Sequence, residues 1–210
     1  MIKQIISEDT QLTPYCLELS TLWYDRQYLL DHLENIDDDD WYEFNCGQIR
    51  WTVQEEFKPR LECKNYRWSE FHLELAKLFN PPITPDTMLY TSTPIGGTSP
   101  HQDRNRPAVL NFAVRGKFEN DSPQTFYRDF DKSTLEYTMP YTVSNQTNEF
   151  APWIFFGPKI HGVENKSDLD RTIITCCWRH NSYDEIFEGI KTGSIINWEQ
   201  NAKNKRIKFL

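Results

Sequence analysis

The feature that most restricts the fold is the segment 108–114, which reads Ala-Val-Leu-Asn-Phe-Ala-Val and is followed closely by Gly116. Successive side chains of a strand point to opposite faces, so a strand of this composition is apolar on both of its faces. That pattern is typical of a strand that is buried on both sides of a sheet. Its single polar residue, Asn111, needs a hydrogen-bond partner if it is buried.

Further strand patterns lie on both sides of this segment, and helical patterns lie mainly before it. The other expected strands are 88–92, 124–130, 134–138, 153–156 and 171–178. Apolar residues recur at helical spacing in 12–33 and 70–79, and a short helix is expected from Tyr183 to Lys191, just before Gly193. Helices followed by several short strands indicate an α+β domain built on an antiparallel sandwich.

The length and composition of the chain favour one folded domain. It has 210 residues, of which 38% are hydrophobic and 14% aromatic, and this is enough apolar surface for a substantial core. No internal repeat or low-complexity linker divides it. We therefore expect a single domain with a helical N-terminal region (about 1–86), a strand-rich core (about 87–179) and a C-terminal extension (about 180–210).

Composition and charge argue against several classes of protein. No apolar stretch approaches the length of a membrane span, and the N-terminus lacks the apolar region of a signal peptide, so we expect a cytoplasmic protein. Five cysteines without CxxC spacing favour a reduced compartment. The net charge of −8 argues against nucleic acid as a substrate. For the basic tail 203–208, a solvated terminus is favoured over a binding patch.

Three residues have the chemistry and the spacing of a metal site. His101 and Asp103 stand two positions apart, so in extended chain their side chains point to the same face. A second imidazole, His161, follows 58 positions after Asp103. Two imidazoles and one carboxylate form the facial triad of non-haem Fe(II) oxygenases, which leaves coordination positions open. Two alternatives stay open: the three residues are unrelated polar side chains, or the site holds Zn²⁺ or Mn²⁺.

Arg171 stands ten positions after His161, at the start of the apolar strand 171–178. An arginine in that position is expected to project its guanidinium into the interior, where a buried charge needs a carboxylate partner. A dicarboxylate co-substrate beside the metal could supply that partner and bind it bidentately. The alternative is a structural salt bridge, for instance to Glu164 or Asp170.

The chain from about Met88 to Trp178 resembles the Fe(II)/2-oxoglutarate-dependent dioxygenases, with features of the prolyl and aspartyl hydroxylases. The resemblance lies in the His-x-Asp segment, in the distal His-x-Val segment (His161 to Val163) and in the arginine ten residues later. It implies a double-stranded β-helix, which is a cupin-like jelly roll, with N-terminal helices packed on one sheet. It also implies that His101, Asp103 and His161 bind Fe(II), that dioxygen takes an open position, and that Arg171 pairs with the far carboxylate of 2-oxoglutarate.

The resemblance also assigns supporting residues. Members of this family often place co-substrate contacts on the strand before the His-x-Asp segment and on the strand after it, and again two residues after the arginine, where this chain has Ile173 in place of Ser or Thr. The residues in or nearest these places here are Tyr90, Ser92, Asn111 and Thr175. Arg104 and Arg106 would hold a substrate carboxylate, or else lie in a solvent-facing loop.

The implied activity is hydroxylation of an amino acid or a peptide side chain. An aspartate at position 103 fills the place that a halide would need, so the resemblance favours hydroxylation over halogenation. The alternative is a cupin-like metal-binding protein without oxygenase activity. Specificity would lie in the loops and the N-terminal region, which carry no motif that identifies the substrate.

Overall fold

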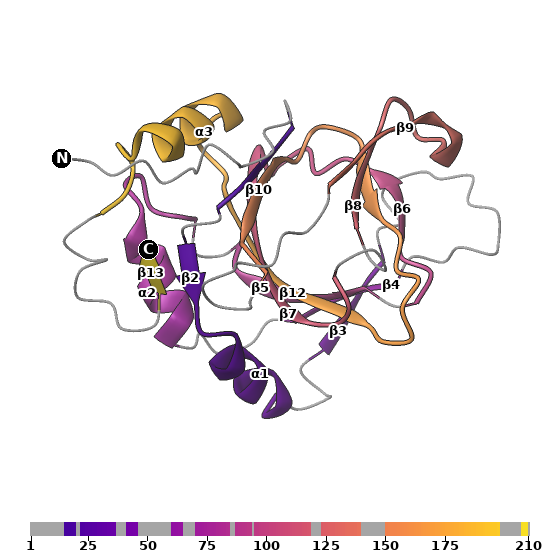
Figure 1. The fold of residues 1–210 in the computed structure, drawn as a ribbon, viewed down its shortest axis with the longest axis horizontal. Helices are drawn as coiled ribbons and strands as arrows, with labels where there is room; N and C mark the ends of the chain where they lie inside the picture. The colour runs from indigo at the N-terminus through magenta and orange to yellow at the C-terminus, as the bar shows by residue number, and fades with distance from the viewer. Residues whose placement is uncertain are drawn as a thin grey trace.

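The computed structural model describes residues 15–19, 22–36, 41–45, 60–64, 70–84, 87–93, 95–118, 123–139, 150–197 and 207–209. In this part of the chain, two antiparallel sheets face each other and helices lie outside the larger sheet (Figure 1). The protein is therefore mostly β, with few helices. The helices are α1 (Arg26–Glu34), α2 (Glu70–Leu78), α3 (Tyr183–Thr192) and the 3-10 helix η3 (Lys132–Thr134).

The larger sheet has seven strands in the order β1-β10-β7-β12-β5-β4-β3. Each neighbouring pair is antiparallel. The most apolar strand, β7, lies between β10 and β12, well inside the sheet. The strands are β1 (Cys16–Glu18), β3 (Trp41–Asn45), β4 (Arg60–Lys64), β5 (Leu89–Thr93), β7 (Ala108–Arg115), β10 (Trp153–Phe156) and β12 (Arg171–Trp178).

The smaller sheet has four strands in the order β6-β11-β8-β9. Its strands are β6 (Thr98–His101), β8 (Gln124–Tyr127), β9 (Leu135–Met139) and β11 (His161–Val163). The two strands expected at 124–130 and 134–138 form a hairpin, in which β8 pairs with β9 across the turn that contains η3. A separate pair joins β2 (Leu22–Tyr24) to β13 (Ile207–Phe209), near the two ends of the chain (Figure 1).

The two faces of β7 belong to two different hydrophobic clusters, as its sequence predicted. Val109 and Ala113 pack in the space between the sheets, together with Phe126 of the smaller sheet. Leu110 and Phe112 point the other way and pack with residues of α1, α2 and α3. The larger sheet is therefore covered on one face by the smaller sheet and on the other by helices. We call these the inner and the outer face.

The polar residue of β7 has the partners that its burial requires. Asn111 lies on the inner face, opposite Trp153 of β10 and Thr175 of β12. With its amide turned to suit these neighbours, it donates to Thr175 Oγ1 over 2.8 Å and accepts from Trp153 Nε1 over 3.2 Å. A row of polar side chains thus crosses the inner face of the sheet, a region that is otherwise apolar.

The N-terminal region was predicted to be helical, and this prediction is only partly correct. Within the segment 12–33, the chain first forms β1 and β2, and α1 begins only after Asp25, whose carboxylate accepts from the backbone of Tyr28. Pairing of β1 with β10 buries Cys16 on the inner face and Leu17 on the outer face. Burial on alternate sides needs the two-residue period of a strand, and this tertiary constraint overrides the helical spacing.

The later predicted helices are confirmed. Residues 70–78 form α2, and α3 begins with the capping box of Ser182 and Glu185 and ends at Gly193, whose φ is 73°. Of the basic tail, residues 203–206 lie outside the described residues. None of the described helices has the length and apolar composition needed to cross a membrane.

The turn between β5 and β6 offers a matched test of the fold. Gly96 and Gly97 have φ values of +93° and +81°, which disfavour any side chain. A Cβ at Gly97 would also clash with the carbonyl oxygen of Val163, whereas nothing lies within 4 Å of one at Gly96. We expect Gly96→Ala to cost about 1 kcal/mol and Gly97→Ala about 2–4 kcal/mol of unfolding free energy, measured by urea denaturation. Equal losses would contradict the close approach of β6 and β11.

Candidate metal centre

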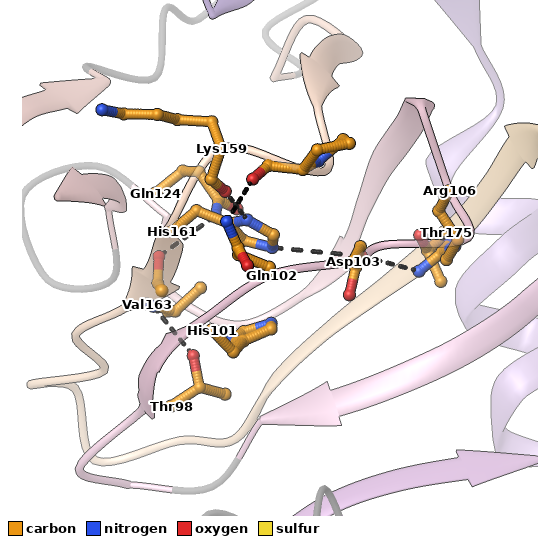
Figure 2. A network of polar contacts seen from close by, with 12 residues as sticks. Thr98, His101, Gln102, Asp103, Arg106, Gln124, Lys159, His161, Val163 and Thr175 are labelled. Carbon is orange, nitrogen blue, oxygen red and sulfur yellow. Dashed lines mark hydrogen bonds and ion pairs between the residues drawn. The ribbon is translucent and has the colours of Figure 1, made fainter. Parts of the chain in front are cut away.

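The pairing of β6 with β11 brings the two predicted imidazoles together. His101 ends β6 and His161 begins β11, and the two residues lie directly opposite each other. Their ring centroids are 4.4 Å apart. Asp103 follows β6 by two residues, and its carboxylate lies beside the rings (Figure 2). One ligand atom from each of the three residues lies within 4.8 Å of the others, a spacing that suits a single bound cation.

Each imidazole is oriented by a hydrogen bond to the carbonyl two residues before it in the chain. His101 Nδ1 is 2.8 Å from the carbonyl oxygen of Ser99, and His161 Nδ1 is 2.7 Å from that of Lys159. A carbonyl oxygen can only accept, so each Nδ1 carries the proton and each Nε2 keeps its lone pair for a metal. This is the outer contact that fixes the tautomer and the ring plane of metal-binding histidines.

The position of Asp103 depends on the turn that precedes His161. Its backbone N–H donates to the carbonyl oxygen of Gly157 over 2.9 Å. A Cβ at position 157 would clash with the carbonyl oxygen of Arg106 and lie 3.1 Å from the Asp103 Cβ, so glycine is needed for this approach. The carboxylate Oδ2 is 3.9 Å from His161 Nε2 and 3.3 Å from Arg106 Nη1. It stays partly open to solvent, with 22% of the side chain exposed.

The protonation states around the triad suit a cation. Burial lowers the pKa of His161 to about 4, and the neighbouring His101 acts in the same direction. Burial would raise the pKa of Asp103, but the charges of Arg106 and of the two histidines outweigh it, and the pKa is lowered. At neutral pH His161 is therefore neutral and Asp103 ionised, which are the forms that bind metals.

The donor set fits a divalent transition metal. Two neutral imidazoles and one carboxylate suit Fe(II), and they equally suit Zn²⁺ or Mn²⁺, because affinity order alone does not select iron. Three protein ligands on one side leave further positions for water or a substrate. Among the described residues, this is the group of His, Cys, Asp and Glu side chains whose ligand atoms converge in this way.

Arg171 lies on the inner face of the larger sheet, as predicted, and only 1% of it is exposed. Its guanidinium carbon is 5.1 Å from the ring centroid of Phe118 and 5.5 Å from that of Trp153. Both rings belong to the cluster between the sheets. The aromatic rings stabilise the buried positive charge of the guanidinium.

Two other predicted contacts lie on the inner face. Thr175 faces inward beside Asn111, and its hydroxyl accepts from Arg106 Nη2 over 2.6 Å. Arg106 therefore contacts both the ligand Asp103 and the sheet. Arg104, in the same turn, is exposed and lies apart from this group. Whether Asn111, Thr175 or either arginine contacts a co-substrate or substrate stays a prediction.

Tyr90 and Ser92 lie on the outer face, away from the triad, which corrects their expected position. The Tyr90 hydroxyl donates to the carbonyl oxygen of Leu29 over 3.2 Å, and Ser92 Oγ is 3.3 Å from Thr172 Oγ1. Tyr90 is part of the cluster that packs against the helices. The cause is the register of β5, because its even-numbered residues face outward and its odd-numbered residues inward.

The inward residues of β5 are ones that sequence reasoning missed. Thr93 lies opposite Arg171, and Thr91 lies opposite Ile173, so both share the inner face. Both are buried. The alternation of a strand predicts that residues two positions apart share a face. It does not predict which face of β5 points inward, because both faces mix polar and apolar residues. Hydropathy therefore could not select which set faces the triad.

Comparison of the chain with protein-family models, with curated proteins and with solved structures found no match. Function therefore has to be inferred from the geometry of the site itself.

The buried His161 gives the metal-free protein a pH-dependent stability. Its pKa is about 4 in the folded state and near its ordinary value of 6.5 in the unfolded chain. Between these values the unfolded state binds more protons, so stability is full above about pH 6.5 and decreases as the pH falls towards about 4. The expected loss is roughly 3 kcal/mol. Asp103, whose pKa is lowered, adds a further loss only at still lower pH.

Urea unfolding of the EDTA-treated protein, at a series of pH values between about 7 and about 4.5, measures this loss. His161→Gln should remove most of the pH dependence in this window. If the variant and the parent lose stability in parallel, the buried neutral imidazole is not its source.

Proposed function

We propose that this protein is an Fe(II)- and 2-oxoglutarate-dependent oxygenase that hydroxylates an amino acid or a peptide side chain. The observation that carries this proposal is the convergence of two imidazole nitrogens and one carboxylate oxygen within 4.8 Å. Two imidazoles and one carboxylate with open positions are the ligand set expected of non-haem Fe(II) oxygenases. The buried Arg171 on the inner face supports the same activity.

The strand order supports a double-stranded β-helix. Among the eight strands from β5 to β12, the larger sheet takes β5, β7, β10 and β12 and the smaller sheet takes β6, β8, β9 and β11. Two facing antiparallel sheets of four strands each are what an eight-stranded jelly roll requires. In this arrangement His101 and His161 lie at the ends of two strands of the smaller sheet. Asp103 lies in the partly exposed turn that follows β6.

His101, Asp103 and His161 would hold the iron. When bound, Fe(II) supplies the activation of dioxygen that couples oxidation of 2-oxoglutarate to hydroxylation of the substrate. The protein contributes a fixed ligand geometry, because both rings are already oriented through Nδ1. It also limits water to the open side, since His161 is 3% exposed while Asp103 keeps contact with solvent.

The charges around the site favour an anionic co-substrate. The negative charge of Asp103 is balanced by Arg106, whose guanidinium is 3.3 Å away, and histidines that bind a metal are neutral. The protein ligands and Arg106 together therefore leave the double positive charge of the metal uncompensated. A dicarboxylate such as 2-oxoglutarate would offset part of this charge with the carboxylate at its keto acid end. Its far carboxylate would pair with the in-plane N–H groups of Arg171.

One observation favours the alternative, a cupin-like metal-binding protein without oxygenase activity. Phe118 and Trp153 already stabilise the Arg171 guanidinium inside the fold. An arginine of this kind contributes to packing whether or not a co-substrate binds. Turnover of 2-oxoglutarate therefore separates the two functions.

The first test is conversion of 2-oxoglutarate to succinate by the Fe(II)-loaded protein, followed by mass spectrometry. We expect succinate to form, and Asp103→Asn and His161→Ala to reduce it at least about a hundredfold while circular dichroism stays unchanged. The matched control is Asp168→Asn, an exposed carboxylate that pairs with Lys117. Tight metal binding with no succinate, with or without candidate substrates, would favour the alternative function.

The second test concerns Arg171. Arg171→Lys keeps the positive charge but loses the planar fork, so we expect the half-saturating concentration of 2-oxoglutarate to rise about tenfold or more. Arg115→Gln removes an exposed arginine of the larger sheet and should leave that concentration unchanged. An unaltered half-saturation in Arg171→Lys would refute the co-substrate role and leave only a packing role.

A further inference from the structure

Arg106 connects the turn that carries Asp103 to the inner face of the larger sheet. One nitrogen, Nη1, is 3.3 Å from Asp103 Oδ2, and the other, Nη2, donates to Thr175 Oγ1 over 2.6 Å (Figure 2). The two partners lie 72 positions apart in the chain, one in a turn and one in the middle of β12. A single guanidinium therefore bridges a metal ligand and a strand of the opposite sheet.

The far end of this bridge is held rigidly. The Thr175 hydroxyl also accepts from Asn111, whose amide oxygen in turn accepts from Trp153 Nε1. These three residues lie on β12, β7 and β10, which are neighbours in the larger sheet, and none is more than 4% exposed. Thr175 is therefore a fixed acceptor, and the position of the Arg106 guanidinium is set by the sheet.

Asp103 needs such a support more than the two histidines do. Each imidazole sits on a strand and is oriented by the carbonyl two residues before it in the chain. Asp103 lies beyond the end of β6, where its backbone N–H donates to Gly157 and its carbonyl accepts from the Arg106 N–H, but neither bond orients its carboxylate. A carboxylate on a turn can rotate about its side-chain bonds, and its orientation is then set by the contacts of its oxygens.

We infer that Arg106 is a positioning residue, which turns the Asp103 carboxylate towards the two imidazoles and is itself held in place by Thr175. This inference rests on the proposed metal site. It replaces a substrate contact for Arg106, because both Nη atoms already have partners within the protein. The role is geometric, since the positive charge of Arg106 alone would repel a cation.

Two substitutions remove the bridge without changing any charge. Arg106→Lys keeps one positive charge but cannot contact two partners with a planar fork. Thr175→Val has nearly the same shape as threonine but lacks the hydroxyl that accepts from Nη2. Thr175→Ser restores that hydroxyl. The matched control is Arg104→Lys, the same exchange at an exposed arginine two positions before Arg106.

The experiment measures binding of Co(II) alone, an air-stable substitute for Fe(II), to the full-length protein. Isothermal titration gives the dissociation constant and stoichiometry, and visible absorption at saturation reports the ligand field. We expect the dissociation constant to rise about tenfold in Arg106→Lys and Thr175→Val, with one ion per chain and an altered spectrum. Arg104→Lys and Thr175→Ser should stay within about twofold of the parent.

The possible results distinguish the positioning role of Arg106 from the existence of the metal site. Parental affinity and spectrum in both Arg106→Lys and Thr175→Val would overturn the positioning role while leaving the metal site in place. Failure of the parent protein to bind Co(II) would refute the metal site and this inference with it. If Arg106→Lys does not fold, the comparison of Thr175→Val with Thr175→Ser decides, because a structural effect alone would not shift the ligand-field bands of folded, saturated protein.

Discussion

The site depends above all on the pairing of β6 with β11. This pairing places His101 directly opposite His161, so both rings leave neighbouring strands at the same point of the sheet. Each ring is then oriented by the carbonyl two residues before it, and both Nε2 atoms stay available. These restraints come from the backbone of two short strands and of the turn that precedes β11. The geometry therefore exists before a cation arrives, and a cation would not have to order the ligands as it binds.

The second constraint is the cost of placing charge between two sheets. The protein meets it differently at its two inner arginines. Arg106 lies against a carboxylate and a hydroxyl near the open side, whereas the more deeply buried Arg171 lies among aromatic rings. A carboxylate partner offsets much of the free-energy cost of desolvating a guanidinium. Aromatic rings offset less of this cost. The first arrangement fixes the guanidinium through polar partners, and the second places it among aromatic rings of the core between the sheets.

The sequence was sufficient for the longer strands between β5 and β12 and for the choice of the triad residues, because both leave regular signals, whereas the short strands β6 and β11 were not expected. Two-residue alternation, the doubly apolar β7 and the spacing of His101, Asp103 and His161 depend on local geometry. The outcome was different where tertiary contacts decide. Residues 16–18 form the strand β1 because they pair with β10, although the apolar residues of this segment have helical spacing. Tyr90 and Ser92 turn outward because the register of β5 is set by β12, which no local pattern encodes. The hydrogen bond from Arg106 to Thr175 joins residues 69 positions apart, so the local sequence around either residue does not predict it.

The glycine at position 157 has a mechanical consequence. It lets the turn before His161 touch the turn after His101, and the contact is fixed by the bond from the Asp103 N–H to the Gly157 carbonyl and by that from Gln102 Nε2 to the Pro158 carbonyl, each 2.9 Å long. Two segments distant in the chain are thereby fastened into one body. A displacement of one segment would therefore displace the other, and the backbone positions of the three candidate ligands are coupled.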